Sequence, residues 1–136
     1  MKILLPLLLL AAACGDHKEA AQRKTPKAIA AESGLAALAY PGWRTVGEDH
    51  ESRDGGVDVY VLRGDKPLDR MPGSVAIPAD AAMQSIRTLA GSEAVGKASI
   101  ATADSAGWNN AAGEWTATQV TTDTGAWLWL QRMLKK

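Results

Sequence analysis

The stretch VDVYVL at residues 57–62 decides the fold, because it is the clearest β-strand pattern in the chain. Successive side chains of a strand point to opposite faces of a sheet, so the three valines of this stretch form one apolar row. Asp58, Tyr60 and Leu62 form the opposite row. This strand is expected to be the second arm of a β-hairpin that covers residues 43–63.

Turn-forming residues mark the ends of the expected strands. The hairpin turn falls at residues 54–56 (Asp-Gly-Gly), where glycine accepts a positive φ without strain. Three further strands are expected at about residues 95–102, 114–122 and 126–133. Residues 123–125 (Asp-Thr-Gly) predict a tight turn between the last two of these strands.

The last expected strand is apolar on both faces. Trp127 and Trp129 share one face, whereas Leu128 and Leu130 share the other. A strand of this kind belongs at the centre of a sheet or beneath a helix. A short C-terminal helix is the alternative, because periodicity does not separate the two over so few residues. Packing in the core is the favoured role of both tryptophans.

The strongest helical pattern covers residues 78–90, where apolar side chains recur with the 3.6-residue period of an amphipathic helix. Asp80 in the first turn suits the positive end of the helix dipole, and Gly91 suits the end of the helix.

A second helix is expected from Thr25 and Pro26, which are typical cap and first-turn residues, to Ala39. Gly34 costs this helix about 1 kcal/mol relative to alanine. Together these elements predict an α+β fold, in which one or two helices pack on an antiparallel sheet of about five strands.

The N-terminus carries a targeting pattern. Lys2 supplies a positive charge, residues 3–10 form a short apolar run, residues 11–13 are three alanines, and Cys14 follows. This arrangement resembles the signal peptide of bacterial lipoproteins. Leucine is preferred three positions before the cysteine in that family, whereas Ala11 stands there in this chain.

The resemblance implies that residues 1–13 are a signal peptide and that Cys14 is lipidated and becomes the first mature residue. Three acyl chains would then hold the protein firmly on a membrane. Gly15, rather than an aspartate, follows the cysteine, which favours the outer membrane over the inner membrane. An ordinary secretory signal and an uncut anchor are the alternatives, although the apolar run falls short of the about 20 residues that span a bilayer.

Composition divides the mature chain into a tether and one domain. Residues 14–27 are charged and lack large apolar side chains, so they predict a flexible lipidated tether. Residues 28–136 are sufficient for a single small globular domain. Cys14 is the only cysteine, so the domain has no internal disulfide.

The charge balance argues against a nucleic-acid partner. The chain of 136 residues has 15 basic and 15 acidic residues, and removal of residues 1–13 removes Lys2 and no acid. The mature chain therefore has 14 basic and 15 acidic residues, and neither sign is in excess. Binding to nucleic acid or to an anionic membrane surface needs a clear basic excess.

No catalytic constellation can be assembled from the sequence. His50 is the only histidine outside the tether, and Gly73-Ser74 lacks the second glycine of a hydrolase nucleophile turn. Residues 48–51 (Glu-Asp-His-Glu) contain metal-binding residue types. Neighbouring residues on a strand alternate between faces, however, and do not all converge on one ion. A solvated hairpin arm is favoured, and we expect no metal, no cofactor and no enzymatic activity.

Trp108 and Trp115 are the remaining candidates for a binding site. They are expected to flank a loop at residues 109–113, beside Asn109 and Asn110. An indole on such a loop could stack on a sugar ring of peptidoglycan or anchor a protein partner. Simple packing of a hairpin is the favoured alternative for this pair.

The sequence thus favours a non-enzymatic binding module, held at the cell envelope by lipid and facing the periplasm. Its partner would be an envelope or periplasmic protein, with the chain acting as an assembly subunit or as an inhibitor. A glycan-binding lipoprotein that uses exposed tryptophans is the second hypothesis. A small envelope enzyme that uses His50 or a pair of acids is the third.

Overall fold

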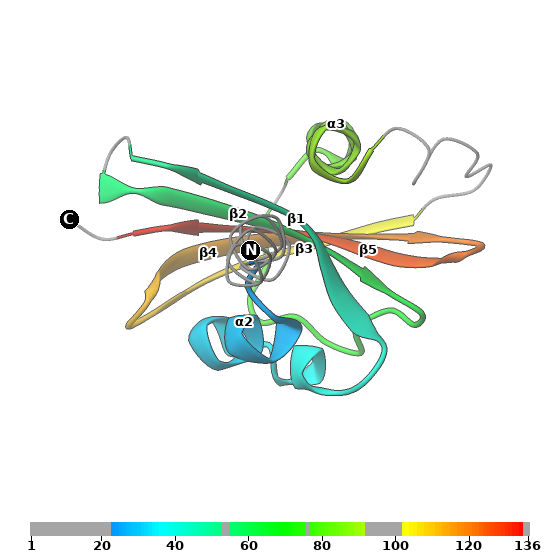
Figure 1. Cartoon of the computed structure of the whole chain (residues 1–136), viewed down its shortest axis with the longest axis horizontal. Helices are drawn as coiled ribbons and strands as arrows, with labels where there is room; N and C mark the ends of the chain where they lie inside the picture. Colours follow the sequence, from blue (N-terminus) through cyan, green and yellow to red (C-terminus); the bar gives the residue numbers. More distant parts are fainter. Residues whose placement is uncertain (1–22, 53–54, 76, 92–101, 135–136) are drawn as a thin grey trace, which may run out of the picture.

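A computed structural model describes residues 23–52, 55–75, 77–91 and 102–134 of the chain (Figure 1). Five strands form one antiparallel sheet in the order β1-β2-β5-β4-β3. The strands are β1 (Trp43–Glu51), β2 (Val57–Gly64), β3 (Thr102–Asn110), β4 (Gly113–Thr122) and β5 (Gly125–Met133). The expected α+β fold with five antiparallel strands is confirmed.

Strand β5 lies at the centre of the sheet, between β2 and β4. Its position confirms the expectation drawn from its two apolar faces, and the alternative of a C-terminal helix is wrong. Tyr60 of β2 pairs with Leu130, and Ala117 of β4 pairs with the same leucine from the other side. The hairpins β1–β2 and β4–β5 are also confirmed, because Thr122 pairs with Gly125 across the expected tight turn.

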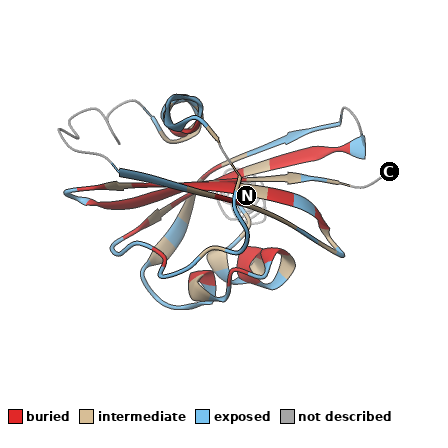
Figure 2. Cartoon of the chain, turned by 180° about the vertical axis from the view of Figure 1, so that it is seen from behind, coloured by how far each residue is buried: buried red, intermediate tan, exposed pale blue. Residues whose placement is uncertain are grey.

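Helices cover both faces of the sheet (Figure 1). On one face, α2 (Pro26–Ser33) and the 3-10 helix η1 (Ala36–Ala39) pack over Leu128 and Leu130 of β5. On the other face, α3 (Ala79–Ala90) packs over Trp127 of β5. Figure 2 shows buried positions along the strands between these two layers and exposed positions on the outer side of α3.

Helix α3 agrees with the helix expected from the sequence. Ala82 and Ile86 are buried, Asp80 lies in the first turn, and Arg87 lies in the last turn. The helix ends at Gly91, whose φ is 98° and whose N–H donates to the carbonyl oxygen of Arg87 at 3.0 Å. A glycine at this position adopts the positive φ without the cost that a side chain would bring.

The first helix is shorter than expected. It begins as predicted, because the Thr25 hydroxyl oxygen accepts a hydrogen bond from the N–H of Ala28 at 3.2 Å and Pro26 follows in the first turn. It ends at Ser33, since Gly34 adopts a φ of 85° and caps the helix. One continuous helix to Ala39 is therefore wrong, and η1 follows as a separate turn.

Strand β3 covers residues beyond the third strand expected from the sequence. Strand β3 begins at Thr102, while residues 95–101 of the expected strand lie outside the described residues, as does Asp54 of the first turn. Most residues of β3 are small, so its sequence has little preference for a β-strand. Pairing with β4 stabilises this strand instead. The loop expected at residues 109–113 is a two-residue turn, because Asn110 pairs with Gly113.

Lys24, before α2, is bonded to strand β1. The backbone N–H of Lys24 donates to Oε1 of Glu48 at 2.7 Å, and the Thr45 hydroxyl donates to the carbonyl oxygen of Lys24 at 2.6 Å. These bonds fasten the residues before α2 to strand β1. Residues 24–27 thus contact the domain, and the expected tether up to residue 22 lies outside the described residues.

Gly47 sets how closely α3 approaches the sheet. The register of β1 shifts between Thr45 and Gly47, and a Cβ atom built on Gly47 would lie 2.7 Å from Cβ of Leu89. It would also lie 2.9 Å from the carbonyl oxygen of Leu89, which is backbone and cannot turn away. The missing side chain is what allows the C-terminal end of α3 to reach β1.

Gly47→Ala should therefore destabilise the protein by about 1–3 kcal/mol, the usual cost of an overpacked contact. The measurement is urea unfolding followed by circular dichroism. Thr102→Ala, at an exposed position of edge strand β3, is the control and should leave the midpoint nearly unchanged. Equal urea midpoints for Gly47→Ala and the wild type would show that α3 does not pack closely against Gly47.

Candidate functional site

Trp108 and Trp115 form a packed corner at the end of the β3–β4 hairpin. They are opposite each other on β3 and β4, and their rings stack with centroids 6.2 Å apart and planes 7° apart. Trp115 has no exposed surface, so it cannot offer a ring face to a sugar or a partner. Trp108 is partly exposed, but its indole N–H donates to the carbonyl oxygen of Ser33 at 2.7 Å.

Asn110 completes this corner. Its Oδ1 accepts hydrogen bonds from the indole N–H of Trp115 at 2.9 Å and from the backbone N–H of Ala112 at 2.9 Å. Its Nδ2 donates to the carbonyl oxygen of Glu32 at 3.0 Å. The last carbonyls of a helix have no partner within the helix, so Trp108 and Asn110 satisfy the end of α2. Only Asn109, which is exposed, has no such role among the four residues considered.

A chain of charged side chains crosses the sheet on the same side as α2. Nδ1 of His50 lies 2.6 Å from Oδ1 of Asp58, and Nε2 of His50 lies 2.7 Å from Oε2 of Glu48. Asp58 is 8% exposed and accepts hydrogen bonds from Arg132 at 2.5 and 3.1 Å. Each of these side chains therefore has an opposite charge beside it when His50 is protonated.

The chain continues to the N-terminal segment. Arg132 donates to Glu32 of α2 at 2.9 Å, and Glu32 accepts from Lys24 at 2.9 Å. The guanidinium of Arg132 also lies 5.2 Å from the centre of the Trp115 ring. Arg132 thus joins the charged chain to the tryptophan corner.

Alternation along β1 explains which acids reach His50. Glu48 and His50 are two residues apart and share one face, and His50 is opposite Asp58 in the hairpin register. The expectation that the side chains of residues 48–51 do not all converge on one ion is therefore correct. The grouping of Glu48, His50 and Asp58 was missed, although the spacing of two and the hairpin register could have revealed it.

The carboxylates of Asp58 and Glu48 favour the protonated form of His50. Hydrogen bonds to Asp58 and then to Glu48 raise the pKa of His50 above its ordinary value. Burial tends to raise the pKa of Asp58, but the hydrogen bonds from Arg132 and His50 outweigh it and hold that pKa below its usual value. Both ring nitrogens of His50 are paired with carboxylates. Within the described ranges, no three His, Cys, Asp or Glu side chains are arranged to hold a metal ion.

A different surface carries the most exposed aromatic side chain in the described part of the chain. Tyr40, at the end of η1, is 71% exposed. It borders a cavity of about 410 Å³ that is also lined by Pro41, Trp43 and Pro67, with Lys66 and Asp69 at its charged positions. We call this region the Tyr40 surface.

The position of Trp43 on the Tyr40 surface depends on a glycine. Trp43 is opposite Gly64 in the β1–β2 hairpin, and a Cβ atom built on Gly64 would lie 2.6–2.7 Å from the indole ring. The ring therefore lies flat across the backbone of Gly64. A second cavity of about 170 Å³ lies beside it and shares Pro41, Trp43 and Lys66 with the first.

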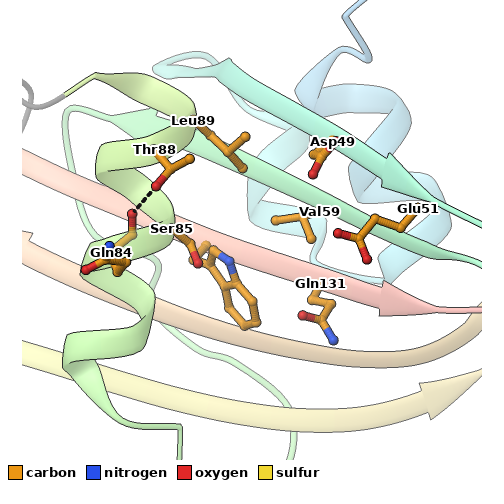
Figure 3. Close-up of a pocket in the computed structure, with 9 residues that line it drawn as sticks. Asp49, Glu51, Val59, Gln84, Ser85, Thr88, Leu89 and Gln131 are labelled. Carbon is orange, nitrogen blue, oxygen red and sulfur yellow. Dashed lines mark hydrogen bonds between the residues drawn. The ribbon is translucent and has the colours of Figure 1, made fainter. Parts of the chain in front are cut away.

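The opposite face carries a smaller cavity of about 220 Å³ between α3 and the sheet (Figure 3). Figure 3 shows Gln84, Ser85, Thr88 and Leu89 along α3 on one side of it, and Asp49 and Glu51 of β1 on the other side. The sheet beneath contributes the side chains of Val59, Trp129 and Gln131.

Comparisons with known proteins do not assign either surface. No protein-family model, curated protein or solved structure matches the chain. Among the described residues, no helix has the length and apolar character needed to cross a membrane.

The raised pKa of His50 predicts a loss of stability as the pH rises. A folded state with the higher pKa binds the proton more tightly than the unfolded state, so the stabilisation is complete below about pH 6.5. It is lost as the pH rises through the folded-state pKa. The urea midpoint should therefore fall as the pH rises above about 6.5, and it should fall less in His50→Gln. An NMR titration that places the pKa of His50 at or below about 6.5 would contradict the prediction that protonated His50 stabilises the folded state.

Proposed function

We propose that this protein is a non-enzymatic binding module, held at the cell envelope through lipidated Cys14, that binds an envelope or periplasmic protein at the Tyr40 surface. The observation that carries the proposal is the 71% exposure of Tyr40 beside a cavity of about 410 Å³. Tyrosine and tryptophan are enriched among the residues that dominate binding energy at protein interfaces.

The composition of the Tyr40 surface supports a protein partner. Tyr40 and Trp43 provide large rings with few rotatable bonds, and Pro41 and Pro67 are conformationally restricted. Such residues lose little conformational entropy on binding. Lys66 and Asp69 place one charge of each sign beside the apolar area, which suits a partner of mixed polarity.

The other hypotheses receive less support. Peptidoglycan binding through Trp108 and Trp115 would need an accessible ring, and Trp115 has no exposed surface. An enzyme that uses His50 would need a ring nitrogen open to a substrate, and both nitrogens are paired with carboxylates. His50 also lines none of the three cavities described above. The proposal includes both an assembly subunit and an inhibitor of an envelope enzyme.

Tyr40→Ala should abolish recovery of the partner. The full chain carries a C-terminal affinity tag, is extracted from membranes in mild detergent, and is captured together with its partner for mass spectrometry. Met133→Ala is the matched control, because Met133 is an exposed apolar residue that does not line the Tyr40 surface.

The supporting result is one protein recovered in stoichiometric amount with the wild type and Met133→Ala, but not with Tyr40→Ala. Its identity would separate an assembly subunit from an inhibitor. Equal recovery with Tyr40→Ala would show that the partner binds elsewhere. Recovery of wall fragments alone would favour the glycan hypothesis.

Cys14→Ser should release the protein from the membrane fraction, because the acyl chains would be absent. Metabolic labelling with an alkyne fatty acid and cell fractionation measure this effect. Gly15→Asp should keep the label but move the protein from the outer to the inner membrane, if the sorting rule implied by the lipoprotein resemblance applies. A membrane-bound Cys14→Ser chain would argue for an uncut anchor instead.

A further inference from the structure

The cavity beneath α3 lies on the opposite face from the Tyr40 surface, and its chemistry is different. Acidic Asp49 and Glu51 line it from β1, and both are exposed. Among the described residues that line it, none is Lys, Arg or His. A cation that approaches these residues would therefore meet the carboxylate of Asp49, whereas an anion would meet like charge there.

The alternation of the strands keeps this cavity acidic. Asp49 and Glu51 lie on the α3 face of β1, while His50 between them points to the other face and pairs with Asp58. In the same way, Gln131 of β5 lies on the α3 face, while Arg132 beside it joins the charged chain on the other face. His50 and Arg132 thus lie on the opposite face of the sheet from the cavity.

The floor and the α3 side add an aromatic surface and neutral hydrogen-bonding groups. Trp129 and Val59 form the apolar floor, and both are partly exposed. Gln131 on the floor and Gln84 on α3 each carry an amide that can donate and accept. The Thr88 hydroxyl donates to the carbonyl oxygen of Gln84 at 2.9 Å, which leaves its oxygen lone pairs as acceptors (Figure 3).

We propose that this cavity binds a compact hydroxylated organic amine, of the amino-sugar class, with its ammonium group at Asp49 and its ring on Trp129. The volume of about 220 Å³ is below the roughly 300–1,000 Å³ of sites for drug-sized ligands, so it suits a single ring. An ammonium group gains from a carboxylate and from the face of a tryptophan. The amides and hydroxyls pair with the hydroxyl groups of the ligand.

Glucosamine is the probe for this site. Binding to the full chain in detergent is followed by NMR through the indole N–H signal of Trp129, which Trp129→Phe identifies. Glucosamine should shift this signal in a saturable way. N-acetylglucosamine has the same ring without the charge, and cyclohexylamine has the charge without the hydroxyls. Each should bind about tenfold more weakly or worse, as expected for the loss of a charge-assisted hydrogen bond or of several neutral ones.

Asp49→Asn tests the placement of the ammonium group, because it keeps the shape of the side chain and removes the charge. This substitution should weaken the binding of glucosamine about tenfold and leave the binding of N-acetylglucosamine unchanged. Asp104→Asn, at an exposed position on the distant edge strand β3, makes the same change in net charge and should have no effect.

The proposal is overturned if glucosamine does not saturate, if N-acetylglucosamine or cyclohexylamine binds as tightly, or if the two asparagine variants behave alike. It does not depend on the partner at the Tyr40 surface. Tyr40→Ala should bind glucosamine normally, so failure of either proposal can be recognised separately.

Discussion

Strand β5 carries large apolar side chains on both faces, and the rest of the architecture follows from the need to cover them. Trp127 is buried beneath α3, while Leu128 and Leu130 are buried beneath α2 and η1. An antiparallel sheet often leaves one face to solvent, but this one cannot do so without exposing part of its core. The two helical layers have different lengths and leave different parts of the sheet uncovered. The Tyr40 surface lies beside η1, and the acidic cavity lies between α3 and the opposite face of the sheet.

The charged chain from His50 to Lys24 lies at the edge of the layer formed by α2. Asp58 and Arg132 occupy neighbouring central strands, where apolar residues would otherwise be expected. They are tolerated because each is paired, and an unpaired charge at that depth would be costly. Arg132 also contacts α2 by donating a hydrogen bond to Glu32. Trp108 and Asn110 donate hydrogen bonds to the last carbonyl oxygens of this helix. Polar groups thus fix the orientation of a helix whose apolar surface is small.

Local patterns predicted the elements that bury the most surface, but not the contacts between distant segments. The alternation in β2, the two apolar faces of β5 and the period of α3 were sufficient to place those elements. The break at Gly34 was visible as a helix-weakening residue, but its left-handed conformation depends on the turn that follows. Strand β3 has almost no large apolar side chains, so only its partner β4 defines it.

The candidate sites also depend on contacts between segments that are far apart in the sequence. Trp108 resembled a loop residue, because its indole N–H donates to the carbonyl oxygen of Ser33 at the end of α2, more than 70 residues earlier in the chain. Nothing in the neighbouring sequence indicates that contact. Tyr40 did not stand out, since a single tyrosine before a proline has no distinctive pattern. Alternation along β1 separates Asp49 and Glu51 from His50, but which of the two faces lies beneath α3 depends on contacts between distant segments.

The bonds of Lys24 to Thr45 and Glu48 have a mechanical consequence for an anchored protein. If Cys14 is fixed in a membrane, any drag on the domain pulls on the chain at Lys24. Its backbone would pass this load to strand β1 through two hydrogen bonds, and its side chain would pass it to Glu32, Arg132 and the central strand β5. The load would therefore be shared between the edge and the middle of the sheet, and α2 would be protected from being peeled away from its N-terminal end.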